Sequence, residues 1–166
     1  MAEITPRLAL PLLQAGQAQK EIYHNEALAM LDIALAAAVE AVGINVPPSS
    51  PAIGQCWLVG SHPTGDWDGA ANAIAGWTSG GWRFVPARVG MVAWSIADQL
   101  FAGFNGIDWQ VGVIVASRVV IDGVQIIGPQ RESIAQPSGG SVVDVEARAA
   151  LDAMLATLRG HGLIAS

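Results

Sequence analysis

Several residue types that define common functional classes are scarce in this 166-residue chain. Cys56 is the single cysteine, which excludes an internal disulfide framework and any zinc site built from several cysteines. Lys20 is the single lysine, and the arginines are scattered along the chain. Because binding to nucleic acid requires clustered Lys and Arg side chains, a net charge of −6 without a basic cluster argues against it.

Long apolar runs are also missing. No stretch reaches the roughly 18 residues of a membrane-spanning helix, and no charged segment followed by an apolar run marks the start as a signal peptide. We therefore expect no membrane insertion, and assembly in the bacterial cytoplasm. Charged residues make up only 13% of the chain, whereas soluble domains average about 25%. This difference indicates that neighbouring subunits cover part of the surface.

Motifs with a specific chemistry are absent too. There is no glycine-rich phosphate loop, no Gly-x-Ser-x-Gly elbow and no His-Glu-x-x-His helix, and the three histidines lie in separate segments. Asp66 and Asp68 form the best carboxylate pair, but the other oxygen ligands of a calcium loop do not follow them. We expect no enzyme activity, no cofactor and no metal.

Residues 1–45 are predicted to form an extended segment and an assembly helix. The helix is expected to begin between Leu12 and Asn25, with Asn25 as a suitable N-cap and Gly43 as its terminator. Apolar residues then recur at steps of three and four, which is typical of a coiled-coil seam: Leu28, Leu31, Leu35, Ala38 and Val42. Two interpretations remain open: the helix packs on its own β domain, or it bundles around a symmetry axis.

Residues 52–128 are predicted to form a small, Trp-rich antiparallel β domain after a Pro/Ser linker. The expected strands cover residues 55–59, 73–78, 82–85, 91–96, 100–104 and 107–111. Asn105-Gly106 and Asp122-Gly123 are strong signals for tight hairpin turns. The second of these turns joins two β-rich runs within residues 113–127.

A weak internal repeat runs through this region. Residues 74–77 (IAGW) with Trp82 resemble residues 101–104 (FAGF) with Trp109. Each copy places an aromatic residue before a turn and a tryptophan after it, so the rings are expected to pair across the strands. We infer a duplicated hairpin.

Most of the six tryptophans are expected to fill the core of the sheet. Trp67 and Trp77 lie near turns and are predicted to be the most exposed. An exposed indole beside Asp66 and Asp68 is suited to stacking on a sugar, so these four residues are the candidate glycan contacts. The alternative for the two aspartates is hydrogen bonding within a surface turn.

Residues 141–166 are predicted to form a C-terminal amphipathic helix with Asp144 as its N-cap. The apolar Leu163 and Ile164 after it require a docking site. The predicted class is α+β. The expected oligomer interface combines apolar positions of both helices: Leu28, Leu31, Leu35, Val42, Leu151, Met154, Leu155 and Leu158.

Residues 15–21 (AGQAQKE), followed by 24–28 (HNEAL) and Leu31-Asp32, closely resemble the N-terminal signature of an uncharacterised domain family of prophages and gene transfer agents. The similarity continues to Trp109, and residues 143–151 (VDVEARAAL) resemble the end of such proteins. Members of the family occur in head-spike, tail-fibre and other host-attachment proteins.

The resemblance implies a structural subunit of a phage-like particle, located on the virion and contacting other capsid or tail proteins. It also implies a homotrimer. Because the chain is short, a base or adaptor of a head spike or tail fibre is favoured over a receptor binder. The alternative is a carbohydrate-binding module that recognises host capsule or envelope polysaccharide through exposed tryptophans.

Overall fold

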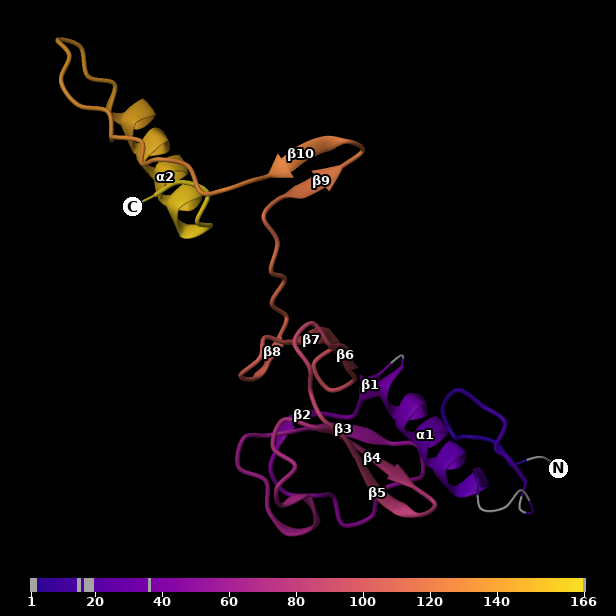
Figure 1. Ribbon diagram of the computed structural model, residues 1–166. Coiled ribbons are helices and arrows are strands. Elements are labelled where there is room, and N and C mark those ends of the chain that lie inside the picture. Colours follow the sequence, from indigo (N-terminus) through magenta and orange to yellow (C-terminus); the bar gives the residue numbers. More distant parts are fainter. Residues whose placement is uncertain (1–2, 15, 17–19, 36, 166) are drawn as a thin grey trace. The chain divides into compact units, whose positions relative to one another are not determined.

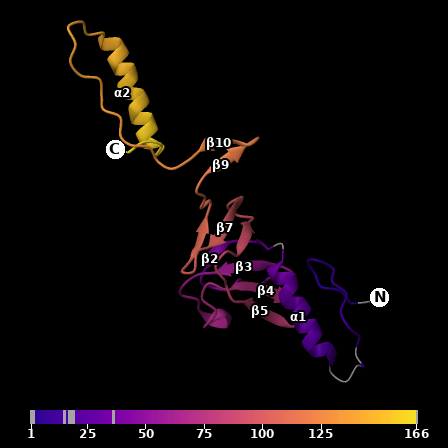
Figure 2. The ribbon, with the colours of Figure 1, turned by 45° about the horizontal axis from the view of Figure 1, so that its top comes forward.

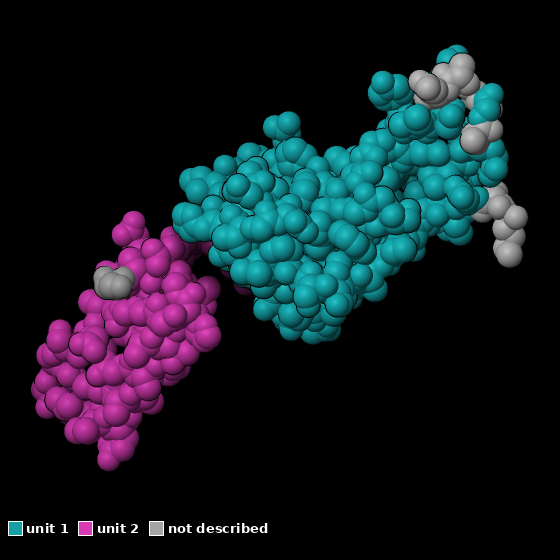
Figure 3. All heavy atoms as spheres, turned by 90° about the horizontal axis from the view of Figure 1, so that it is seen from below, with its two compact units in different colours: residues 1–113 teal, residues 114–166 magenta. Residues whose placement is uncertain are grey.

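The computed structural model describes residues 3–14, 16, 20–35 and 37–165. The chain forms two compact units, residues 1–113 and residues 114–166 (Figure 3). Residues 52–128 were predicted to form one β domain. The observed boundary after residue 113 lies inside this range, because the hairpin that follows belongs to the second unit. The observed class is α+β, as predicted.

In the first unit, helix α1 spans Lys20–Ala34 (Figure 1). It begins inside the expected range but ends well before Gly43. Asn25 is not its N-cap: its side-chain amide instead exchanges two hydrogen bonds with the backbone of Leu13, at 2.9 and 3.0 Å. Val42 lies outside the helix, so the predicted seam does not extend to it. Residues 38–44 pair with strands of both sheets, and those ladder bonds outweigh the helix propensity of the alanines.

Two four-stranded sheets follow the same plan. The first sheet has the order β2-β3-β4-β5, and the second has the order β1-β6-β7-β8. Each is a three-stranded antiparallel meander extended by one short parallel strand from the segment after α1. The first sheet comprises β2 (Val42–Ile44), β3 (Cys56–Val59), β4 (Ile74–Thr78) and β5 (Gly81–Val85). The second comprises β1 (Ala38–Val39), β6 (Val92–Ser95), β7 (Leu100–Phe104) and β8 (Trp109–Val111).

The predicted duplication is present in the strand registers. Trp77 lies opposite Trp82 and Phe104 lies opposite Trp109, with ring centroids 4.9 and 5.3 Å apart. This confirms the expected cross-strand ring pairs. Gly76 pairs with strands on both sides, as its counterpart Gly103 does in the second sheet. The repeat therefore extends from a hairpin to a whole four-stranded sheet.

The core of the first unit consists of two clusters on opposite faces of the first sheet. One face carries Leu58 and Ile74, which pack against Ile33 of α1 and against Ala102 of the second sheet. Figure 2 shows α1 beside β4 and β5. The other face carries Trp57, Trp77 and Trp82 and is covered by Trp67, which lies at the end of the short 3₁₀ helix η1 (Gly65–Trp67).

The second unit contains the hairpin of β9 (Val119–Ile121) and β10 (Val124–Ile127) and the helix α2 (Val145–Gly160). Asp144 caps α2 by accepting a hydrogen bond from the Ala147 backbone at 2.8 Å, as predicted. Ile164 is 5% exposed and forms a bridge with Arg131, so the apolar C-terminal segment is docked on the segment that precedes α2.

Candidate functional site

The most unusual surface belongs to the β9–β10 hairpin and the segment leading into it. Every residue from 113 to 127 is exposed. The segment is nevertheless rich in valine and isoleucine, with Ile114 at 89% exposure and Val115 at 91%. Adjacent residues of a strand point to opposite faces, so the exposed neighbours Val120 and Ile121 make both faces of this hairpin apolar.

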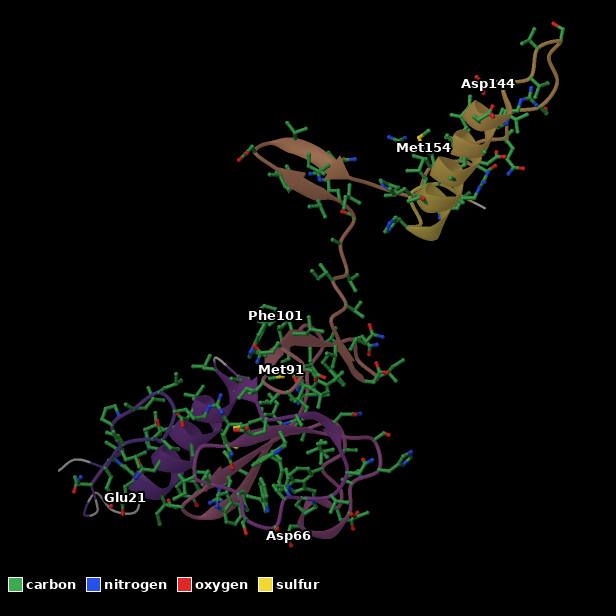
Figure 4. The ribbon with its side chains drawn as sticks, turned by 180° about the vertical axis from the view of Figure 1, so that it is seen from behind. Glu21, Asp66, Met91, Phe101, Asp144 and Met154 are labelled. Carbon is green, nitrogen blue, oxygen red and sulfur yellow. The ribbon has the colours of Figure 1, made fainter. Side chains whose placement is uncertain are left out.

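Helix α2 carries the second apolar surface. Leu151 and Met154 are 44% and 55% exposed, whereas Leu155 is buried and Leu158 half-buried within the same unit. Figure 4 shows Met154 projecting from the helix. The residues of the predicted interface therefore have two different environments. Leu155 packs within its own unit, whereas Leu151 and Met154 remain exposed.

Helix α1 divides in a similar way. Asp32 and Ile33 are the residues that the unit buries, while Leu31 is exposed, Leu35 is exposed just beyond the helix end and Leu28 is half-buried. The helix thus packs on its own β domain and leaves part of the predicted seam uncovered.

The candidate glycan contacts do not form a single exposed site. Asp66 and Asp68 are exposed and Trp77 is half-buried. Trp67 is 0% exposed, so the prediction that it is among the most exposed tryptophans is wrong. Helix η1 turns its indole inward, where its centroid lies 5.1 Å from Trp82 and 6.3 Å from Trp57. The aromatic clustering of this sheet outweighs the turn position from which exposure was inferred.

A second aromatic feature was not predicted. Trp94 and Phe101 lie directly opposite each other on β6 and β7, with centroids 4.9 Å apart. Phe101 is 61% exposed, and Val92 on the same face is 57% exposed. In the sequence, these residues alternate with Ala93 and Ala102, which are buried. This alternation shows that the strand has two different faces, but it does not show which face another element covers.

A cleft of about 420 Å³ lies between the N-terminal segment, α1 and the β4–β5 hairpin. Its walls include the ion pair between Arg83 and Glu26, at 2.7 Å. Arg7 donates to the carbonyl of Gly54 and to the Cys56 sulfur, both at 3.0 Å. The charged side chains of the cleft thus bind one another and the backbone.

Burial raises the pKa of the Cys56 thiol, and the neighbouring Arg7 guanidinium opposes this shift only in part. A thiol with a raised pKa is a poor nucleophile near neutral pH. Within the described part of the chain, no three His, Cys, Asp or Glu side chains are placed to hold a metal ion. Among the described residues, no helix has the length and hydrophobicity needed to cross a membrane.

The chain matches the model of a protein family. The model of a family described as protein of unknown function, DUF2793, matches residues 24–110. No curated protein matches the chain. The matched region begins within α1 and ends within β8, so it covers both duplicated sheets except for Val111. Because it covers just over half of the 166 residues, the chain belongs to the DUF2793 family.

Proposed function

We propose that the protein is a homo-oligomeric structural subunit of a phage-like particle, forming the base or adaptor of a head spike or tail fibre. The resemblance of residues 15–32 and 143–151 to prophage and gene-transfer-agent attachment proteins supports this setting. The exposed apolar β9–β10 hairpin is the observation that carries the assembly role.

An isolated two-stranded hairpin is only marginally stable in water. Apolar patches of this kind on a soluble chain mark surfaces that a partner covers. Among the described residues the hairpin forms a sheet of two strands, so the backbone groups along its outer edges are sites for pairing with further strands. Identical copies satisfy both requirements at once, because each supplies one hairpin to a shared core.

The proposed trimeric state comes from the resemblance to spikes and fibres. The measurement that tests the oligomer is the mass of the purified full-length chain by multi-angle light scattering across micromolar concentrations. The expected mass is three times the 17.2 kDa of one chain. A mass of one chain at every concentration would refute the assembly role.

A double substitution, Val120→Glu with Ile126→Glu, places charges on the hairpin and is expected to shift the mass to that of one chain. The matched control is Val89→Glu in the first unit, where a valine that is 74% exposed lies outside the proposed interface. Equal dissociation by both variants would show that the effect is not specific to the hairpin.

The attachment role is tested on particles. Deleting the gene is expected to leave filled particles that lack a spike or fibre and no longer adsorb to host cells, and adding the wild-type chain back restores both. Particles that keep their spikes, fibres and adsorption without this chain would refute the placement.

Carbohydrate binding is the second candidate. It is favoured by the half-buried Trp77 and by the exposed carboxylates of Asp66 and Asp68. Retention on host polysaccharide is expected to be lost in Trp77→Ala and reduced in Asp66→Asn/Asp68→Asn, with the oligomer mass unchanged. Unchanged retention in all these variants would exclude these residues as the glycan site.

A further inference from the structure

The internal duplication makes it possible to compare equivalent faces of the two sheets. The covered face of the first sheet carries Cys56, Leu58, Ile74, Gly76 and Arg83. The open face of the second sheet carries, at the equivalent register positions, Val92, Trp94, Phe101, Gly103 and Gln110. The two faces have the same backbone layout, so what occupies one indicates what the other accommodates.

Helix α1 occupies the covered face at two points. Ile33 lies over Gly76 so closely that a Cβ atom there would come within 2.6 Å of the isoleucine side chain. Two helical turns earlier, Glu26 forms its ion pair with Arg83, the cross-strand neighbour of Gly76. Gly76 thus leaves room for the side chain of Ile33, and Arg83 carries the charge opposite to that of Glu26.

The open face has the same recess without an occupant. A Cβ atom at Gly103 would meet nothing within 4 Å among the described residues. Around it, Val92 and Phe101 are more than half exposed. Gln110 lies beside Gly103, at the position that Arg83 occupies on the covered face. The open face therefore has an uncharged residue where the covered face has the arginine that pairs with Glu26.

We propose that the open face binds helix α2 of a second copy of this chain, with Met154 over Gly103. Leu151 and Met154 are exposed and three positions apart, which is the spacing of Met30 and Ile33, the α1 residues that pack into the core. In α1 the residue seven positions before Ile33 is Glu26; in α2 the residue seven positions before Met154 is Ala147.

The charge pattern also permits α2 at this face. Ala147 carries no charge and leaves none unpaired beside Gln110, whereas a residue such as Glu26 requires the arginine that the covered face supplies. Contact between a helix of one copy and a sheet of the next joins two different surfaces, and such contacts close into a ring when the rotation between successive copies adds up to a full turn. This arrangement rests on the proposed homo-oligomer and is compatible with a trimer.

Photo-crosslinking of the full-length chain tests the contact. Phe101 is replaced by p-benzoylphenylalanine, and ¹⁴N- and ¹⁵N-labelled chains are mixed before irradiation. We expect crosslinks between light and heavy chains that map to residues 149–159, the tryptic peptide that holds Leu151 and Met154. The same probe at Tyr23, which is 80% exposed on α1, is the control and is expected to give no crosslink to that peptide.

The outcomes separate the two proposals. An oligomer by light scattering whose crosslinks from position 101 avoid α2, or join residues of one chain only, overturns the docking proposal and leaves the assembly role intact. A chain that remains a monomer overturns both.

A double-mutant cycle with two charged substitutions adds a test whose expected result cannot arise from misfolding. Gln110→Arg and Ala147→Glu are each expected to weaken assembly by on the order of tenfold, because each leaves a charge unpaired in the contact. Together they reproduce the Arg83–Glu26 pair and are expected to restore assembly to within about threefold of wild type. Ala147→Glu is expected to be tolerated by α2 itself, since an acidic residue in the first turn of a helix is favoured by the helix dipole. Additive weakening in the double variant would contradict the proposed register.

Discussion

Thr5 donates its hydroxyl hydrogen bond to the buried carboxylate of Asp32 at 2.7 Å, which joins the N-terminal segment to helix α1. The same carboxylate accepts from the backbone of Arg7 at 3.1 Å and of Leu8 at 2.7 Å. Asp32 is 1% exposed. One acidic side chain thus holds a whole turn of the segment that precedes the helix.

Asp32→Ala is expected to destabilise the first unit by about 2–4 kcal/mol, because three donors lose their acceptor in a buried place. Urea unfolding followed by tryptophan fluorescence measures the change. Asp68→Ala, in an exposed loop, serves as the control and is expected to stay within about 0.5 kcal/mol of wild type. Equal stability of the two variants would mean that the hydrogen bonds to Asp32 contribute little.

Gly76→Ala is expected to lower the thermal stability of the chain, since its methyl group overlaps Ile33. Overpacking of this kind costs about 1–3 kcal/mol. Gly103→Ala is the matched substitution at the equivalent strand position, where the chain itself leaves room for the methyl group. If calorimetry gave the same loss for both alanines, the closeness of Ile33 would not be the cause. Ile33→Val in the Gly76→Ala background is expected to recover part of the loss.

Trp67→Ala is expected to cost about 3–5 kcal/mol, as the loss of a fully buried aromatic side chain does. Trp67→Phe should cost distinctly less. The indole Nε1 has no hydrogen-bond partner among the described residues, so the change to phenylalanine removes ring area without breaking a hydrogen bond to any of them. Trp94→Ala, on the open face, is the comparison and is expected to change the unfolding midpoint of the unit far less. A larger effect at Trp94 than at Trp67 would contradict the burial of these two rings.

The pKa of Cys56 is raised by burial, which sets the sign of a pH dependence. Below the ordinary thiol pKa the group is protonated in both the folded and the unfolded chain and contributes no pH dependence. As the pH rises above that value, the unfolded thiol ionises first, so stability is lost until the folded pKa is also passed. Urea unfolding between pH 7 and pH 10 is expected to show this loss, and Cys56→Ala to reduce it. The same alkaline slope in both proteins would assign it to other groups.

Local patterns predicted much of this fold. Alternating apolar residues and the turns at Asn105-Gly106 and Asp122-Gly123 placed the strands to within a few residues, because strand periodicity and turn chemistry are local properties. The Asp144 cap of α2 was predicted for the same reason. The ring pairs Trp77–Trp82 and Phe104–Trp109 followed from the repeat, since equal spacing around a turn gives equal register.

The candidate sites depended on packing, which local patterns describe poorly. Trp67 was predicted to be exposed because it lies near a turn. In the structure η1 directs its indole into the core, where it is buried. The open face with Phe101 was missed, since alternation identifies two faces of a strand without saying which one another element covers.

The sequence alone determined the α+β class, the strands, the capped C-terminal helix and the scarcity of catalytic groups, because each depends on short-range periodicity or on composition. Only the tertiary structure decided that residues 38–44 leave α1 to extend both sheets. It also decided that the covered and open faces of a duplicated sheet differ in exposure. The physical reason is that backbone pairing and burial join residues far apart in the chain, and their combined free energy exceeds the preferences of any one segment.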